Sequence, residues 1–507
     1  MARKIDSRIK VKGTLVTESP IHVGGINDYP EVDLALAMNG QGQYYIPGTS
    51  FAGVFRNWMQ ISGNENIDYL WGFQKENGDG HASYVIVEDA PILRVVVEIR
   101  DGVGIDRFWG TAAQQIKYDR AIIPRGSKIP LDMTLEIASN SQDWTNYKAR
   151  FAHLIRALEN GEIRLGAAKT RGLGRVKLQN TSIREYNLCS RNGMLQALLG
   201  GDDVKITLDS ILNGNQTLYQ NPRLTFEINW EPQSPLMVKA EGDGLAVDIL
   251  PLVSAVDNSL TFVLPGSSIK GALRTQAERI VRTVLSLPTR EEQDPKKRFI
   301  EQLEVPLVRD LFGATANTDK TDNKTQLGKI GSLFVDDCYA NLPISAAAWR
   351  NIQAATNDQN LREALNDAKL QNTQQAFHVA VDRWTGGAAD GFLYSNLEPM
   401  GVTWQPIRFT FTLNRLKQHQ VPGISLLLLV LRDLAEGRIP LGYGTNRGMG
   451  SIKVKSVVIH GFNLDDSLAA LATTLPNGSL SELNRELLDK LNSAWMEWIN
   501  GQVQEGV

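Results

Sequence analysis

IPGTSFAGVFRNW at residues 46–58 returns as LPGSSIKGALRTQ at residues 264–276. Each phrase opens with Pro-Gly, a strong turn signal, and in the first phrase Thr49 or Ser50 is suited to cap a helix. Apolar residues then recur at the spacing of one helical face. From the two phrases into the residues just after them, they are Phe51, Val54, Phe55, Trp58 and Met59, and Ile269, Ala272, Leu273 and Ile280. The doubled phrase therefore predicts two equivalent turns, each followed by an amphipathic helix.

Further landmarks occur in both halves of the chain in the same order. Ser19-Pro20 returns as Ser234-Pro235, and the late TRGLG segment at 170–174 returns as NRGMG at 446–450. The separation between matching landmarks only grows along the chain, which indicates a tandem duplication with insertions in the second copy. We predict these parts: a first domain at 1–184, a linker at 185–220, a second domain at 221–462, and a helical tail at 463–507.

Within each repeat the pattern predicts the order strand, helix, strands, helix, strand. RIKVKGTLV, SKIPLDMTLEI and GRVKL alternate as strands do, and NYKARFAHLIRALENG has the pattern of a helix that ends at glycine. This order is the split βαβ pattern of ferredoxin-like and RNA-recognition folds. We therefore predict an α+β protein with two tandem domains of that type. An insertion before residue 381 of the second repeat is also predicted to be helical.

Composition limits the function classes. The net charge is −3, so any anion-binding surface must be local. Two cysteines imply no disulfide framework and exclude a metal site built on thiolates. The longest apolar run, ISLLLLVL at 424–431, is too short to span a bilayer, and the first residues lack the apolar core of a signal peptide. We expect a cytoplasmic protein with no membrane partner.

Two kinds of segment could bind an anion. The helix starts offer backbone N–H groups, with Arg56 and Arg274 on the polar side, and glycines inside the helices at 53 and 271 leave room for another backbone. The glycine-rich loops LGAAKTRGLGRVKL and LGYGTNRGMGSIKV, at 165–178 and 441–454, carry cations and let a ligand approach closely. Neither loop matches a Walker A or dinucleotide-binding motif.

Taken together, these segments resemble the RAMP superfamily of CRISPR systems. The Pro-Gly-[ST]-Ser helix starts, SPIHVGG, and the late glycine-rich loops are similar to the backbone subunit of type III effector complexes, and two such repeats in one chain are similar to the fused double-backbone subunit of a type III-D variant complex. The resemblance implies binding to CRISPR RNA, to target RNA and to other effector subunits. It also implies β-hairpin thumbs, expected at 97–123 and 379–400.

The resemblance also suggests which residues contact RNA. Lys270 fits the basic position of the motif, where the first repeat has Ala52. The RNA-binding candidates are Gly48, Thr49, Ser50, Arg56, Lys169, Arg171, Gly266, Ser267, Ser268, Lys270, Arg274, Asn446 and Arg447.

For cleavage of target RNA, the family uses an aspartate in the loop before the Pro-Gly helix, which implies Asp33. Asp248 matches Asp33 in the register that also matches the two Ser-Pro pairs, so we favour these aspartates as catalytic residues and as possible ligands of a Mg²⁺ ion. Asp28 and Asp243 share that register and are the alternative pair. His22 corresponds to Met237 in the second repeat, so a histidine base shared by both repeats is not expected.

Three other functions remain as alternatives. The chain could be a guide-RNA scaffold without cleavage, an endonuclease that processes precursor CRISPR RNA, or a duplicated α+β protein that acts on a small molecule. A single aspartate per site suffices for cleavage because the 2′-OH of RNA can itself be the nucleophile, while the carboxylate orients it or holds Mg²⁺.

Overall fold

The computed structural model divides the chain into two compact units. Unit 1 contains Met1–Ile99, Arg120–Lys169 and Leu173–Asn221, and unit 2 contains Arg100–Asp119, Thr170–Gly172 and Pro222–Val507. Two short pieces of the first repeat therefore belong to unit 2. The structure describes residues 3–25, 32–62, 67–75, 78–93, 96–138, 144–200, 205–212, 221–240, 244–287, 294–315 and 328–504.

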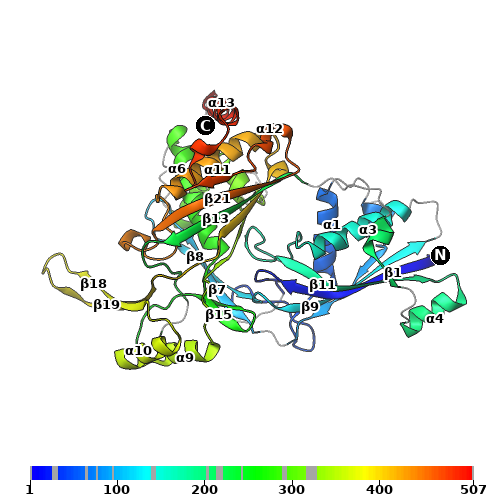
Figure 1. The fold of residues 1–507 in the computed structure, drawn as a ribbon, viewed down its shortest axis with the longest axis horizontal. Coiled ribbons are helices and arrows are strands. Elements are labelled where there is room, and N and C mark those ends of the chain that lie inside the picture. The colour runs from blue at the N-terminus through cyan, green and yellow to red at the C-terminus, as the bar shows by residue number, and fades with distance from the viewer. Residues whose placement is uncertain are drawn as a thin grey trace. The chain divides into compact units, whose positions relative to one another are not determined.

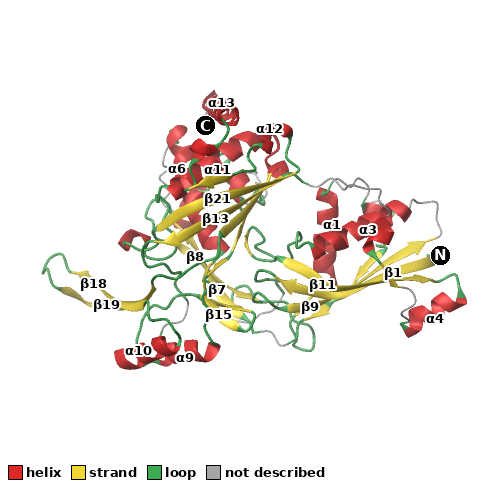
Figure 2. Cartoon of the chain, viewed as in Figure 1, coloured by secondary structure: helices red, strands yellow, loops and turns green. Residues whose placement is uncertain are grey.

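Unit 1 is built on an antiparallel sheet with the order β12-β11-β1-β9-β5. Helices α1 and α3 pack against each other and against this sheet (Figures 1 and 2). Residues that alternate along β1, such as Ile9 and Val11, are fully buried. The elements are β1 (Ile5–Thr17), α1 (Gly48–Ile61), β5 (Val85–Val87), β9 (Lys128–Ala138), α3 (Trp144–Glu159), β11 (Val176–Asn187) and β12 (Lys205–Ile206).

Unit 2 repeats this plan around the sheet β10-β16-β20-β13-β21-β22. The four strands shared with unit 1 keep the same spatial order, with the first strand of the repeat between the last and the third. This order confirms the predicted split βαβ folds. The elements are β10 (Arg171–Gly172), β13 (Arg223–Pro232), α6 (Gly266–Val284), β16 (Leu333–Asp336), β20 (Ile407–Thr412), α11 (Gln420–Ala435), β21 (Ile452–Phe462) and β22 (Thr474–Pro476).

Unit 2 also carries helices that unit 1 does not show among its described residues. The insertion expected to be helical forms α9 (Ala346–Ala354) and α10 (Asp358–Asp367), and α7 (Pro295–Gln302) follows α6. The predicted helical tail forms α13 (Arg485–Gln504), which packs on α11 and buries Leu487, Leu491, Trp495 and Trp498. No helix in the described part of the chain is long and apolar enough to cross a bilayer.

Both predicted hairpins are present. The first is β7 (Glu98–Ile105) with β8 (Ala112–Ile122), and the second is β18 (Thr373–Val381) with β19 (Ala388–Pro399). The outer part of the first hairpin, Arg100–Asp119, belongs to unit 2. The second hairpin extends away from the rest of unit 2 (Figure 1).

The helix caps differ from the prediction that Thr49 or Ser50 caps α1, which is wrong. The residue before α1 is Pro47, which offers no side-chain cap, and the N–H of Gly48 donates to Asp89 Oδ1 at 2.7 Å. In the second repeat the N–H of Gly266 donates to Asp337 Oδ1, also at 2.7 Å. A carboxylate suits a helix N-terminus because of the helix dipole. The first N–H group of each helix is therefore bound by a carboxylate of the chain itself.

Candidate nucleic-acid interface

The two favoured aspartates occupy equivalent places in their units. Asp33 and Asp248 are both exposed. The residue after each one forms an isolated parallel bridge to the second strand of a hairpin, Leu34 to Arg120 and Ile249 to Asn396. Arg120 and Asn396 themselves match in the register that relates the late glycine-rich loops of the two repeats. The alternative pair at positions 28 and 243 lies outside the described residues.

The carboxylate of Asp248 is fixed by the base of the second hairpin. The backbone N–H and the hydroxyl of Ser395 both donate to Asp248 Oδ2, at 2.7 and 3.0 Å. A backbone hydrogen bond joins the same two segments, since the N–H of Ile249 donates to the carbonyl of Ser395 at 3.0 Å. In the sequence of the first repeat, Asp119 stands where the second repeat has Ser395.

An arginine of each glycine-rich loop meets a tyrosine of a hairpin. Arg171 Nη1 donates to the hydroxyl of Tyr118 at 3.2 Å, and Arg447 Nη1 donates to the hydroxyl of Tyr394. Arg447 also lies over the ring of Tyr443, 4.9 Å from its centroid. Both arginines are exposed, and a guanidinium beside aromatic rings is suited to bind a phosphate or to stack on a base.

The sequence analysis did not single out Tyr118 or Tyr394. The signal was available, because the two tyrosines match in the same register as the loop arginines. Tyrosines are common hairpin residues, so only the repeat register distinguishes this pair.

Two glycines of the glycine-rich loops are required because the loops pack closely against the chain's own backbone. A Cβ at Gly166 would overlap the carbonyl oxygen of His22, and one at Gly442 would overlap the carbonyl oxygen of Met237. The expectation that these two glycines admit a ligand is therefore wrong, since the backbone they approach is the chain's own. Gly448 is different, because it has a positive φ of 83° and no atom lies within 4 Å of a Cβ built there.

His22 is a structural residue. It is buried, and its Nδ1 lies 2.7 Å from the carbonyl oxygen of Ala121, at the base of the first hairpin. Burial lowers the pKa of His22, and the nearby Arg120 lowers it further, although the bond to Ala121 works in the opposite direction. The ring therefore links the loop after β1 to β8, and Met237 takes the equivalent buried place in unit 2.

Lys270 lies inside unit 2. Its side chain is buried, and Nζ donates to the carbonyl of Leu333 at 2.8 Å. Burial lowers the pKa of Lys270 well below its usual value, and the charges of Arg171, Arg274 and Arg415 lower it further. Arg171, Arg274 and Arg415 therefore place positive charge around the start of α6 in a chain of net negative charge.

The helix arginines differ between the repeats. Arg274 donates to Glu278 Oε1 at 2.6 Å and to two backbone carbonyls, so its guanidinium already holds α6 to the loops around it. Arg56, its equivalent in α1, forms a more exposed ion pair with Asp68 at 2.7 Å.

The remaining predicted contact residues vary in exposure. Among the candidates, Thr49, Ser267 and Asn446 are exposed, Ser50, Ser268 and Lys169 are half-buried, and Gly48 and Gly266 are buried. The helix glycines at 53 and 271 have an open side, because no atom lies within 4 Å of a Cβ built at either position.

A resident metal would have few protein ligands here. Among the described residues, no group of three or more His, Cys, Asp or Glu side chains could hold an ion. Mg²⁺ commonly takes one or two carboxylates and completes its shell with waters and phosphate oxygens. Single exposed carboxylates such as Asp33 and Asp248 fit an ion shared with a bound nucleic acid, and Oδ1 of Asp248 accepts no hydrogen bond from the described residues.

Fold and site together define a class: a protein with two RNA-recognition-type domains in tandem, each of which presents an exposed aspartate. The sequence profile of the RAMP superfamily matches residues 14–177 and 249–453. The chain therefore belongs to the RAMP superfamily and is a CRISPR-associated RNA-binding protein. A search among curated proteins gives no match.

Proposed function

We propose that the chain is the guide-RNA-binding backbone subunit of a type III CRISPR effector complex and cleaves guide-paired target RNA at two sites, one in each repeat. The equivalence of Asp33 and Asp248 is the observation that supports this proposal most. Both are exposed, and both precede the residue that bridges to a hairpin. A position kept in both copies, outside the cores of the units, is better explained by chemistry than by packing.

The guide RNA would run along the helix starts and the glycine-rich loops. Arg171 and Arg447 would contact its phosphates, while Tyr118 and Tyr394 offer rings on which bases stack. Lys270 would not contact the RNA directly, because its side chain is buried and Nζ donates to the carbonyl of Leu333. The complex would work in the cytoplasm with the other effector subunits.

In each site the aspartate would orient the 2′-OH of the target RNA or hold a Mg²⁺ ion near the scissile phosphate. A bound Mg²⁺ would supply charge neutralisation at that phosphate. An aspartate is a weak base at neutral pH, which favours the orienting or metal-holding part over proton abstraction. The burial of His22 supports this assignment, since no histidine base is then available at that position.

The test is cleavage by the reconstituted complex with the Asp33→Ala/Asp248→Ala double variant. We expect target cleavage to fall by at least about 100-fold while guide and target binding persist. The matched control is Asp28→Ala/Asp243→Ala, which should cleave normally. Unchanged cleavage products from the first variant would indicate a non-catalytic scaffold. Loss of cleavage in the second variant alone would indicate that Asp28 and Asp243 are the catalytic pair.

Processing of precursor RNA is tested separately. The purified chain is incubated with precursor CRISPR RNA in the absence of other subunits, and we expect no cleavage. Site-specific cleavage would assign the chain to the processing endonucleases instead.

A further inference from the structure

The last long strand of each repeat is followed by the same two kinds of element. In unit 1, β11 is followed by α4 (Arg191–Leu199) and then by β12, which pairs antiparallel with β11. In unit 2, β21 is followed by α12 (Asp466–Ala469) and then by β22, which pairs antiparallel with β21. The two helices are therefore equivalent, and a difference between them marks something that only one unit has.

The apolar side chains of these two helices differ in burial. In unit 2, Leu468 of α12 and Leu471 just after it are buried in the core. In unit 1, Leu198 and Leu199 of α4 are both 83% exposed. Apolar residues at i, i+1, i+4 and i+5 lie on one side of a helix, and a clustered exposed apolar surface commonly marks an interaction site. The exposed apolar residues of α4 are Met194, Leu195, Leu198 and Leu199.

Unit 1 has no element of its own that covers these side chains. Figure 1 shows α4 on the side of the sheet away from α1 and α3. The segments between the described ranges are short and predominantly polar in sequence, and the one that directly follows α4 reads GDDV at 201–204. A cover for α4 must therefore come from outside unit 1.

A row of three cations crosses the sheet beside the end of α4. Lys10 on β1 is in register with Arg184 on β11, and Arg184 is in register with Lys205 on β12, so the three residues share one face. Arg184 Nη1 also donates to the carbonyl of Gly200, the residue that ends α4, at 3.0 Å. Like charges directly opposite one another destabilise a sheet. This face is therefore suited to a partner that brings negative charge.

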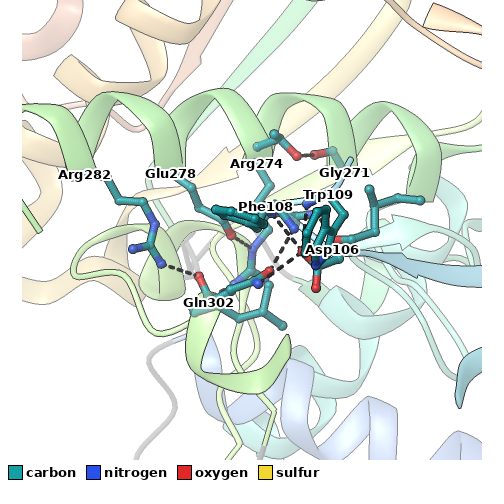
Figure 3. Close-up of polar contacts among 12 residues, drawn as sticks. Asp106, Phe108, Trp109, Gly271, Arg274, Glu278, Arg282 and Gln302 are labelled. Atoms are coloured by element: carbon teal, nitrogen blue, oxygen red, sulfur yellow. Dashed lines mark hydrogen bonds and ion pairs between the residues drawn. The ribbon is translucent and has the colours of Figure 1, made fainter. Parts of the chain in front are cut away.

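Carboxylates are the groups that the chain itself uses where it brings cations together. In unit 2, Arg274 donates to the buried Glu278 at 2.6 Å, and the same carboxylate also accepts a hydrogen bond from a hairpin arginine (Figure 3). On the sheet face of unit 1, Asp132 Oδ2 is shared by Lys10 and Lys12, at 3.5 and 3.1 Å. One carboxylate between two lysines leaves this face positively charged.

We propose that α4 and the cation row of Lys10, Arg184 and Lys205 form a docking surface for another protein. Its apolar groove would receive the exposed side chains of α4, as in helix-in-groove recognition, and Asp or Glu residues at the rim of the groove would face the cations. Charge complementarity selects this partner. Symmetric pairing with a second copy would bring two cation rows together, and RNA would leave the apolar side chains in water. The inference rests on the proposed function only in expecting the partner among the effector subunits.

Cys189 is a native reporter of this surface. It lies just before α4 and is exposed, whereas Cys338 is buried. A thiol reagent should modify Cys189 in the free chain and in the chain bound to guide RNA alone, and should modify it far more slowly in the purified effector complex. Equal rates in the free chain and the complex would overturn the proposal. So would protection by RNA alone, or protection in the free chain that grows with its concentration.

Carbodiimide coupling tests the chemistry of the partner, because it joins a lysine only to a carboxylate in contact with it. In the purified complex we expect Lys205, which is exposed, to couple to an Asp or Glu of another protein, mapped by mass spectrometry. Coupling of Lys205 to a second copy of the chain, or to no other protein, would overturn the proposal.

Substitution of exposed leucines supplies the third arm. Leu198→Glu/Leu199→Glu should reduce retention of the coupled partner by at least about 100-fold, because two leucines no longer become buried. The double variant should unfold at the temperature of the parent chain, since both side chains are exposed. Met496→Glu/Val503→Glu, on the exposed side of α13, is the matched control and should retain the partner. Equal retention in the two variants would contradict the docking surface.

Arg191→Glu tests the charge at the start of α4. Arg191 is exposed, and its reversal should reduce retention by about tenfold, whereas Arg362→Glu on the exposed side of α10 should not. Sedimentation of the parent chain with anionic phospholipid vesicles, lost in the double leucine variant, would instead assign the surface to a membrane and overturn the proposal. These readouts concern assembly, so they remain interpretable even if the aspartate variants cleave normally.

Discussion

Asp89 and Asp337 hold the same helix start in the two repeats, yet their surroundings differ. Asp89 is exposed, whereas Asp337 is buried and paired with Arg100 of the first hairpin. Both repeats thus keep a carboxylate that accepts the first N–H of a helix. Only in the second repeat does this carboxylate also bind a hairpin residue. The carboxylate at the helix start should therefore contribute more to the free energy of unfolding in the second repeat than in the first.

Replacing each aspartate in turn should show this difference most clearly. Asp337→Ala would leave Arg100 buried without its counter-ion, so we expect a loss of about 3–5 kcal/mol in unfolding free energy. Asp89→Ala removes only an exposed helix cap and should cost about 1 kcal/mol. Urea unfolding measures both, and equal losses would contradict the comparison.

Glycines of the two late loops give the next largest contrast. Gly172 has a φ of +95°, and a Cβ there would overlap the carboxylate of Asp337, whereas Gly448 has an open side. We expect Gly172→Ala to cost more than about 2 kcal/mol, since a clash adds to backbone strain. Gly448→Ala should cost about 1 kcal/mol, from the left-handed backbone alone. Thermal unfolding of the two variants checks the order, and a reversed order would refute it.

Ser395→Ala should separate the two cleavage sites. The hydroxyl of Ser395 holds the carboxylate of Asp248, so its removal should slow cleavage at the second site by about tenfold and leave the first unchanged. Ser395→Thr keeps the hydroxyl and is the control. The lengths of the target RNA products report each site. If both sites slow equally, Ser395 acts through assembly of the complex instead.

The smallest effect concerns acid sensitivity at the first hairpin tip. Burial alone would raise the pKa of Asp106, but N–H groups of its own turn, Gln302 and Arg298 outweigh it and lower the pKa below the usual value. The contribution of Asp106 to stability is therefore complete above the unfolded-state pKa of about 4 and is lost as the pH falls through the lower folded value. Asp106→Asn should flatten the pH dependence of stability below about pH 4 relative to the parent chain. An unchanged slope would contradict this linkage.

The fold could be predicted from the sequence because each repeat gave independent evidence for the same order of strands and helices. Strand alternation in 9–15, helical spacing after Pro47-Gly48 and the shared register together predicted both split βαβ folds, whereas the hairpins were expected only from the resemblance to the RAMP superfamily. The helix caps could not be predicted this way. Asp89 lies far from Gly48 along the chain, so the bond depends on tertiary packing, whereas cap rules consider only neighbouring residues.

The candidate site was predicted only in part. The sequence showed that Asp33 and Asp248 occupy matching positions in the two repeats. Only the structure showed that Ser395 donates to the carboxylate of Asp248. For Lys270 the sequence was misleading. A lysine just after a helix start is typical of an exposed cation, but here the side chain is buried and donates to a strand carbonyl. Exposure is set by which elements pack together, and motifs do not encode it.

Mapping the target RNA products of the single variants Asp33→Ala and Asp248→Ala tests the central claim most directly. In the assembled complex, we predict that each variant loses one cut and keeps the other, so that the two product patterns are complementary. Guide binding measured on the same samples should be unchanged. Retention of both cuts in both variants, or loss of both cuts in either one, would contradict an account in which each repeat carries its own aspartate-dependent site.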